Sequence, residues 1–482
     1  MGLWPWTKHV KATVRTAVRV IRAKFDSAQT TPDNMRHWAN ADYLSANASA
    51  RPEIRRTLRN RARYEVANNS YAKGIVLTLA NDVIGTGPRL QMLLGDGEDD
   101  GLNGIVEKEF SAWARAVDLS GKLRTMRMSR AQDGEAFGLL FSNGSLQHPV
   151  KLDCKLIEAD QVTTPLCKLP TPTFVDGIVF DEFGNPSQYH VLDYHPGDFL
   201  TMAPLAYKTI PAASIIHWFR KDRPGQSRGL PDILPALPLF AQLRRYTLAV
   251  ISAAESAANI AIFMKTNTPA GGEAAEVEPM TEMEFSPNMA VFGPEGWEPT
   301  QIRAEQPATT YDMFKREILN EIARCISMPY NVAAGNSSGY NYASGRLDHQ
   351  TYYKSIRVEQ AHCEAVVLDH IFDAWMSEAV KVYPELAGLE DWPHQWFWDG
   401  QEHVDPAKEA SAQAQRLASN TTTLASEYAK QGKDWETELR QRAKEVALMQ
   451  ELGLTVAQVQ PANDQPPNKD ESTDEKHQSQ AA

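Results

Sequence analysis

The sequence predicts an α+β protein of more than one domain, from its length and from the order of its periodic segments. At 482 residues the chain exceeds the size at which a single hydrophobic core stops growing. Helical periodicity dominates before residue 88 and after residue 230, whereas short β-forming runs separated by Gly, Pro and Asn fill much of 135–220. Helices and strands therefore come in separate blocks, unlike the alternation of a parallel α/β sheet.

Apolar residues that recur every three or four positions predict the helices. They are expected at 51–87, 104–117, 231–265, 310–327 and 344–382. The first ends at Gly85-Thr86-Gly87-Pro88, a glycine cap followed by proline. A phosphate-binding loop is the alternative for these glycines, but such a loop opens a helix after a strand, and this one closes a helix.

The predicted strands lie within EAFGLLFS, KLIEADQV and AASIIHWFRK, and GIVFDEFGNPSQYHVL predicts a hairpin with its tip at Gly184-Asn185-Pro186. Asp133 and Glu135 in DGEAFG could pair as an acid and a base, although a turn leading into a strand also explains them. Residues 405–454 predict two or three short helices broken at Gly432, with Asp434 as an N-cap. The polar, proline-bearing end of the chain predicts a disordered tail over 456–482.

Charge is distributed unevenly. The whole chain has a formal charge of −12, yet residues 1–64 hold 13 Lys and Arg against 4 Asp and Glu, a net of +9 that leaves −21 for the rest. Residues 1–25 predict a basic amphipathic helix with Val10, Val14 and Val18 on one face. This helix could bind a membrane surface or dock on an acidic protein surface. No run of about 18 apolar residues occurs, so we expect no membrane span.

No pattern in the sequence predicts catalysis or metal binding. GNSSG at 335–339 fits the nucleophile elbow of α/β-hydrolases, with Ser337 at its centre and Asp369/His370 or Asp391/His394 downstream. A helical pattern precedes it, however, where that elbow needs a strand. His362 and His370 would lie about 80° apart around a helix, so they would not share a metal ion. We expect no enzymatic activity, no metal and no cofactor, and free thiols at the scattered cysteines Cys154, Cys167, Cys325 and Cys363.

The segment GNSSGYNYASGR, residues 335–346, is polar and aromatic in an otherwise acidic chain. No carboxylate occurs between Cys325 and Gly345, as a surface close to phosphate groups requires. An ordinary exposed turn is the other interpretation. Asn336, Asn341, Tyr340 and Tyr342 could contact a nucleic-acid backbone without reading its sequence. We expect Arg346 to pair with a carboxylate such as Asp348 or with one from a neighbouring copy of the chain.

Several blocks, in order, resemble the lambda-like portal family of tailed phages. They are NNSYAKGIVLTLANDVIGTGPRLQ, DGEAFGLL, LIEADQV, IPAASIIHWFRKDRPGQSRGLPDILPAL, ILNEIARCISMPYNVAAGNSSGYNYASGR and DPAKEASA. The fifth block, in which a helix, Met-Pro-Tyr and a loop ending in Asn-Tyr-Ala-Ser-Gly-Arg follow one another, is the most diagnostic. The resemblance spans roughly residues 50–455.

The resemblance implies a multi-domain portal fold that assembles into a ring around a central channel. In that fold the chain would divide into a basic N-terminal arm (1–49), an α+β wing (50–228), stem helices (229–265 and 310–328), a clip (266–309), a tunnel loop (329–343), a wing spine helix with the segment after it (344–404) and a crown (405–455). The resemblance further implies that the tunnel loop projects into the channel near the DNA. Its DNA-facing residues would be Asn336, Ser337, Ser338, Tyr340, Asn341, Tyr342 and Arg346.

The same resemblance implies a function and a set of partners. The chain would form the DNA conduit at the capsid vertex for packaging, head-tail connection and ejection, as a ring of twelve copies. Double-stranded DNA would pass without sequence-specific contact, and terminase, capsid or scaffold protein and head-completion proteins would bind the ring. It would be found in the virion, and in the host cytoplasm during assembly.

Overall fold

The computed structural model describes residues 25–94, 100–164, 171, 173–198, 206–259, 263–266, 297–300, 308–339, 341–400 and 406–454. The chain divides into two compact units. The first comprises residues up to Gly87 together with Met92–Pro393, and the second comprises Pro88–Gln91 together with the chain from His394. The basic helix expected at 1–25, most of 266–309 and the tail expected after 455 lie outside the described residues.

The helix expected at 51–87 is two helices. A short helix, α1 (Ala46–Ser49), precedes α2 (Pro52–Asn68) and α3 (Ser70–Ile84). Asn69 separates them because its backbone is extended and its side chain accepts hydrogen bonds from the first amides of α3. Gly85 ends α3 at a φ of 57°, as the sequence predicts. The buried face of α2 holds two arginines, Arg55 and Arg59, whereas Ile54 of the expected apolar stripe is exposed.

One helix was missed by the sequence analysis. The expected segment 104–117 corresponds to α4 (Asp100–Ala116), and a second helix, α5 (Leu119–Asp133), follows it. The buried side of α5 includes Arg127 and Arg130, so this helix has no continuous apolar stripe that would reveal it. Gly134 ends α5 in the left-handed conformation, and the chain passes directly into a strand.

Most of the strands described in the first unit form two small antiparallel sheets. One has the order β3 (Leu152–Ile157), β2 (Glu135–Ser142), β8 (Ile215–Phe219), and the other runs β4 (Phe174–Val175), β5 (Ile178–Phe180), β6 (Pro186–Leu192), β7 (Tyr207–Pro211). The expected hairpin is confirmed as β5 and β6. A shared core joins the sheets, made of Phe137, Ile157, Ala159, Val162, Ile178, Tyr189, Val191 and Ile215.

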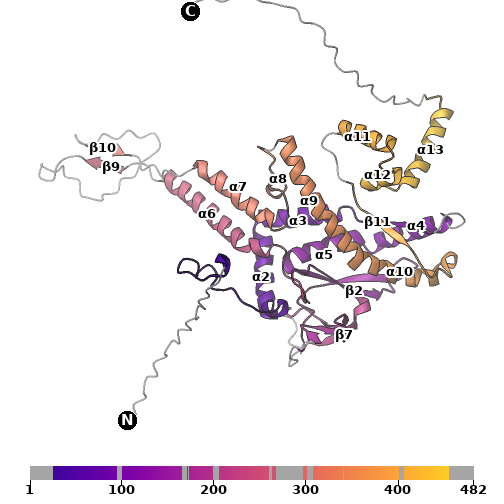
Figure 1. Ribbon diagram of the computed structural model, residues 1–482, viewed down its shortest axis with the longest axis horizontal. Coiled ribbons are helices and arrows are strands. Elements are labelled where there is room, and N and C mark those ends of the chain that lie inside the picture. The colour runs from indigo at the N-terminus through magenta and orange to yellow at the C-terminus, as the bar shows by residue number, and fades with distance from the viewer. Residues whose placement is uncertain are drawn as a thin grey trace, which may run out of the picture. The chain divides into compact units, whose positions relative to one another are not determined.

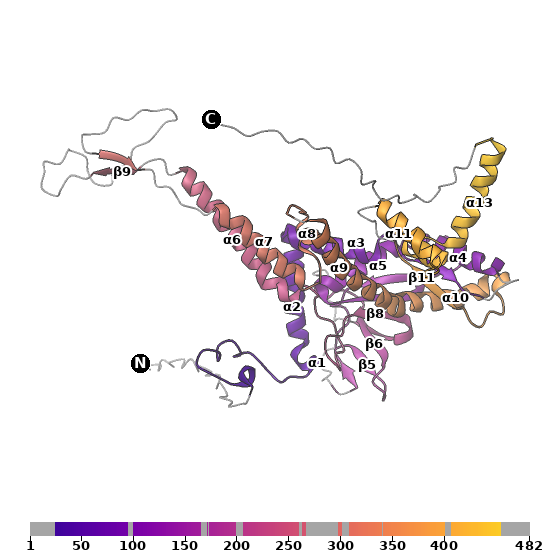
Figure 2. The same cartoon turned by 45° about the horizontal axis from the view of Figure 1, so that its top comes forward.

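Two long helices, α6 (Leu237–Asn259) and α7 (Ala308–Arg324), lie side by side (Figures 1 and 2). Their contact includes Tyr246, whose ring centroid lies 4.5 Å from that of Phe314 and 5.7 Å from that of Tyr311. The helix expected at 231–265 is shorter at both ends. A 3₁₀ turn at Leu234–Ala236 precedes α6, and β9 (Phe263–Thr266) follows it and pairs with β10 (Trp297–Thr300).

The long helix expected at 344–382 is confirmed with one interruption. It comprises α9 (Tyr342–Cys363), a π-helical turn (Glu364–Leu368) and α10 (Asp369–Val382). A π turn shifts the buried face by adding a residue. Beyond it, Phe372 and Trp375 pack against Phe110 and Trp113 of α4, with ring centroids 5.3 to 6.4 Å apart. A short helix, α8 (Tyr330–Ala334), precedes α9.

The second unit contains the expected short helices. They are α11 (Pro406–Ala418), α12 (Leu424–Lys430) and α13 (Trp435–Glu451), and Asp434 caps the last through its side chain. The break at Gly432 is also confirmed, at a φ of 70°. A strand pair, β1 (Arg89–Met92) with β11 (His394–Phe397), belongs to this unit and was not expected. Over the described ranges, no helix combines the length and the apolar character that a membrane crossing requires.

Candidate functional site

The polar segment predicted as a phosphate-facing surface forms a tight exposed turn between α8 and α9. Tyr330–Ala334 is helical, so the expected loop at 329–343 reduces to Gly335–Asn341. The expectation of one continuous loop was wrong, because Tyr330–Ala334 forms a short helix that begins directly after Pro329 and that Gly335 ends at a φ of 61°.

Asparagine side chains fix both ends of this turn. The carboxamide oxygen of Asn336 accepts from the amide of Ser338 at 2.9 Å and from its hydroxyl at 2.5 Å. Asn341 caps α9 by accepting from the amide of Ser344 at 2.8 Å. Asn336, Ser337 and Ser338 are all exposed, so the turn displays hydroxyl and amide groups to solvent. Tyr340 lies outside the described residues, and for Tyr342 only its place as the first residue of α9 is described.

The turn is anchored at its base. The side-chain amide of Asn331 in α8 lies 3.0 Å from Nε2 of His349 in α9, and the other ring nitrogen of His349 lies 3.4 Å from the hydroxyl of Tyr353. These contacts hold the short helix α8 against the first turns of α9.

Arg346 lies in the second turn of α9 and is exposed. The ion pair expected with Asp348 is absent from the described residues. Positions two apart on a helix point about 200° apart, so these two side chains do not face one another. Arg346 therefore presents an uncompensated positive charge close in sequence to the turn.

The structure adds cationic residues that the sequence analysis missed. Arg316 of α7 has its guanidinium 5.3 Å from the ring centroid of Tyr330, the first residue of α8. A Cβ at Gly339 of the turn would lie 3.7 Å from Nη1 of Arg316. Its neighbour Lys315 lies 5.1 Å from the ring of Tyr71, and a hydrogen bond to that tyrosine raises the pKa of Lys315. Only the fold brings position 316 to position 339, so no sequence signal could have found it.

The geometry around Ser337 does not fit a catalytic nucleophile, and the geometry around His362 and His370 does not fit a shared metal ion. Ser337 follows a helix and not a strand, and it has no hydrogen-bond partner within the described ranges. Nε2 of His370 lies 2.8 Å from the carbonyl of Ala213, while His362 accepts from the indole of Trp218 at 3.2 Å. These two histidines thus serve different parts of the fold.

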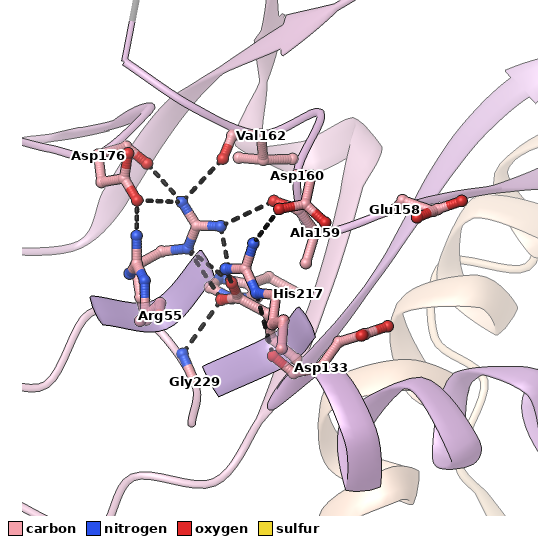
Figure 3. A network of polar contacts seen from close by, with 12 residues as sticks. Arg55, Asp133, Glu158, Ala159, Asp160, Val162, Asp176, His217 and Gly229 are labelled. Atoms are coloured by element: carbon pink, nitrogen blue, oxygen red, sulfur yellow. Dashed lines mark hydrogen bonds and ion pairs between the residues drawn. The ribbon is translucent and has the colours of Figure 1, made fainter. Parts of the chain in front are cut away.

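Glu135, a candidate acid or base, belongs to a buried ion cluster. Figure 3 shows this network with its members His217, Gly229 and Asp176 labelled. Glu135 is fully buried at the start of β2. Its carboxylate accepts from Arg228 at 2.7 to 3.1 Å, from Arg59 at 2.8 Å and from the amide of Gly229 at 3.1 Å. Burial by itself would raise its pKa, but Arg228, His217 and Arg59 together hold the pKa of Glu135 well below 4.5.

His217 is the remaining hydrogen-bond donor to the carboxylate of Glu135. Burial lowers the pKa of His217, so the ring is neutral near pH 7. Its Nε2 lies 3.1 Å from Glu135 and donates to it, which leaves Nδ1 to accept from the hydroxyl of Tyr189 at 3.3 Å. The ring stacks on Phe137 and Phe219, each at 4.3 Å.

The remaining bonds of Arg228 tie the cluster to two loops. The guanidinium donates to the carbonyls of Ala159, Val162 and Asp176 at 2.5 to 3.2 Å. The carboxylate of Asp176 also pairs with Arg55 from α2. Arg228 is 1% exposed, so these contacts replace all of its hydration.

A carboxylate pair at the edge of this cluster invites comparison with a metal site. One ligand atom from each of Glu158, Asp160 and His195 lies within 4.8 Å of the others. The guanidinium of Arg63 already contacts both acids, at 2.8 Å from Asp160 and 3.4 Å from Glu158. A fixed cation therefore already compensates these carboxylates.

A second buried cluster lies four residues further along the chain from Arg228. Asp232 is 1% exposed and pairs with Arg127 at 2.9 Å and with Arg220 at 3.0 Å. Arg127 also contacts Glu359 of α9 at 2.7 Å. Between the two clusters, a Cβ on Gly229 would overlap the carbonyl oxygen of Gly134. The segment that leads into α6 is therefore held against β2 by the ion pair of Arg228 and against α5 by the ion pair of Asp232.

The described cysteines are free thiols, as expected. They are Cys154, Cys325 and Cys363, and Cys167 lies outside the described residues. Burial raises the pKa of Cys154 and of Cys325 to about 11 each, so neither is a thiolate at neutral pH.

A comparison with protein families identifies the class of protein that this arrangement belongs to. A family model described as "Phage portal protein, lambda family" matches residues 31–360, well over half of the chain. The chain therefore belongs to the lambda family of phage portal proteins. That family is structural and not enzymatic, and its members are virion components.

Individual relatives are distant. The chain is 26% identical over 426 residues to a protein of Halomonas phage phiHAP-1 described as "Probable portal protein", covering 83% of this chain and 81% of the relative. It also resembles chains in two structures of a gene transfer agent (GTA). For "Neck of empty GTA particle computed with C6 symmetry" the TM-score is 0.45 at 12% identity, with 77% of this chain and 92% of that chain covered. For "Neck of native GTA particle computed with C12 symmetry" the TM-score is 0.45 at 11% identity, with 79% of this chain and 94% of that chain covered.

Proposed function

We propose that this protein forms a ring of twelve copies around a channel for double-stranded DNA at the capsid vertex. The observation that carries the proposal is the match of residues 31–360 to the lambda family of portal proteins. DNA would enter the capsid through the ring during packaging and leave through it during ejection, and the same ring would connect head and tail. The protein would position and guide the DNA without catalysing a reaction.

The two-unit chain accommodates the portal subdivisions. Residues 50–228 form the wing, α6 and α7 form the stem, 266–309 the clip, and 405–455 the crown. The paired helices α6 and α7 support the stem assignment, since they are long and adjacent, and the segment that leads into α6 contains Arg228 and Asp232 of the buried ion clusters. The long α9–α10 helix is the spine of the wing.

The turn Gly335–Asn341 is the tunnel loop that meets the DNA. It displays neutral polar groups, it carries no carboxylate, and Arg316 and Arg346 bring positive charge to its base and to the following helix. Such a surface can touch phosphates without reading bases and without binding so tightly that the DNA stops. The same ring binds terminase during packaging, capsid or scaffold protein during assembly in the host cytoplasm, and head-completion proteins afterwards.

Negative-stain electron microscopy of the purified full-length chain tests the assembly. We expect rings with a central channel, and twelve-fold symmetry in class averages. Rings without a channel wide enough for duplex DNA would contradict the proposal. A chain that stays monomeric when capsid and scaffold protein are supplied would contradict it as well.

Complementation of a portal-deficient phage tests the role of the turn. Ser337→Ala should leave the yield of DNA-filled heads unchanged, because the hydroxyl has no chemical task there. Arg346→Glu should reduce DNA-filled heads while rings still form, because it places a carboxylate where phosphates pass. Normal packaging by Arg346→Glu would remove Arg346 from the DNA-facing set.

A further inference from the structure

Arg316 is held in place near the turn without being neutralised by a carboxylate of the described residues. It lies on α7, and its guanidinium sits over the ring of Tyr330 at 5.3 Å. A cation–π contact at an exposed site contributes only about 0.5–1 kcal/mol, enough to orient the side chain but not to cancel its charge. Arg316 forms no ion pair with any carboxylate of the described residues, and the residue is exposed.

The position of Arg316 relative to the turn is defined by Gly339. A side chain at position 339 would come within 3.7 Å of Nη1 and 4.0 Å of Nη2 of Arg316, so both terminal nitrogens lie directly beneath the turn. Gly339 has a φ of 81°, a conformation that glycine adopts without strain. Glycine at this position both permits the turn and leaves the guanidinium accessible.

The surroundings favour an anion. The chain from Cys325 to Gly345 contains no carboxylate, and Lys315, adjacent in sequence, lies over the ring of Tyr71 at 5.1 Å. Asp312, Glu317 and Glu321 are the acids of α7, and within the described chain none of them makes an ion pair or a hydrogen bond with Arg316. A planar guanidinium with free N–H groups matches the geometry of a phosphate diester.

We propose that Arg316, positioned by Tyr330 beneath the 335–341 turn, is a binding site for the backbone phosphates of double-stranded DNA. This inference rests on the proposed function and names the residue that supplies the charge at that site. In a ring, one such guanidinium per subunit forms a circle of weak phosphate contacts, each reversible as the duplex moves. Tyr330 is a positioning residue, because it acts through Arg316.

The test measures the affinity of purified rings for a short fluorescent DNA duplex between 50 and 200 mM NaCl, an interval over which phosphate contacts weaken strongly. Arg316→Gln should weaken binding at the low-salt end and flatten the dependence of log affinity on log salt by roughly 0.9 for each phosphate that the ring no longer neutralises. Tyr330→Leu should weaken binding less and in the same direction, and Arg316→Lys should retain most of the slope.

Arg324→Gln is the matched control, since Arg324 is an exposed arginine in the last turn of the same helix. It should leave the salt slope at the wild-type value. Each variant is first checked for rings by electron microscopy. If Arg316→Gln rings bind DNA with the wild-type affinity and slope, or if Arg324→Gln lowers both equally, the assignment of Arg316 is overturned. If wild-type rings hold no duplex at all, the proposed function fails instead, so the two failures are distinguishable.

Discussion

Glu135 is a buried carboxylate whose charge is compensated entirely within the protein, by Arg228, Arg59 and hydrogen bonds from His217 and Gly229. Removing one partner of such a group leaves the others buried and unpaired, which costs more than the pair itself contributes. The cluster therefore makes a sharp prediction about single residues.

Glu135→Gln should destabilise the folded chain by about 3–5 kcal/mol, because the two arginines lose their buried counter-charge. The midpoint of thermal unfolding of the purified protein measures the effect. Glu182→Gln, at an exposed carboxylate in the β5–β6 turn, is the control and should move the midpoint little. Equal midpoints for the two variants would mean that the ion cluster contributes nothing to stability.

Stability should also fall on acidification. The pKa of His217 is lowered by burial from 6.5, so unfolding lets the ring take up a proton once the pH drops below that value. The pKa of Glu135 is held well below 4.5, so its contribution is complete above pH 4.5 and is lost as the pH falls from there towards the folded pKa. Burial raises the pKa of Asp133, so the titration of this residue makes the folded state relatively more stable as the pH falls, opposite to Glu135.

Thermal unfolding from pH 7.5 down to pH 4 should therefore show a falling midpoint. In Glu135→Gln the part of the decline below pH 4.5 should be reduced, since the titrating carboxylate is gone. A flat profile for the wild-type protein would mean that folding lowers the pKa of neither His217 nor Glu135.

At the scale of elements, the chain between β8 and α6 leads from the three-stranded sheet into the paired helices α6 and α7. Arg228 and Asp232 enter separate buried clusters, and Gly229 between them lies against the backbone of Gly134. A side chain cannot fit between these two backbone segments without moving them.

Gly229→Ala should therefore lower the unfolding midpoint strongly and reduce the yield of soluble protein. Gly144→Ala is the control, because a Cβ at Gly144 meets no atom within 4 Å. Differential scanning fluorimetry of both variants checks the prediction. If Gly229→Ala were as stable as the control, the backbones of Gly229 and Gly134 would not be in close contact, contrary to the prediction.

The elements also differ in how far the sequence predicts them. Gly85, Gly432 and Asp434 mark helix ends correctly because caps act through local backbone geometry. The helix α5 was missed because Arg127 and Arg130 are on its buried side, and only partners distant in sequence, Asp232 and Glu359, make that burial favourable. The division of 51–87 at Asn69 is local, but an asparagine within a helical pattern does not by itself indicate a cap.

At the scale of the whole molecule, α6 has apolar residues that nothing in the described chain covers. Leu248 is 61% exposed and Ile251 is 49% exposed, on a helix rich in alanine and serine. Small residues let helices approach closely, and a ring of identical subunits needs a surface that meets a neighbouring copy. We predict that this face of α6 lies between subunits of the ring.

Leu248→Glu together with Ile251→Glu should convert rings to monomers or small oligomers, because the change buries charge at each contact. Mass photometry at fixed protein concentration measures the distribution. Phe183→Glu, at a residue 82% exposed in the β5–β6 turn, should leave the rings intact. Intact rings in the double variant would move the subunit contact to another surface.

The class of fold, the long helix after the turn and the acid-free character of residues 325–345 could be predicted from local periodicity and composition, and the family from the resemblance of ordered sequence blocks. The placement of charge, in contrast, depends on the tertiary structure. In the fold, Arg55 and Arg59 are buried and pair with acids up to about 120 residues away in the sequence, and Arg316 lies beneath Gly339. The physical reason is that burying a charge is favourable only when its partners are assembled around it, and those partners are brought together by the fold, not by their neighbours in the sequence.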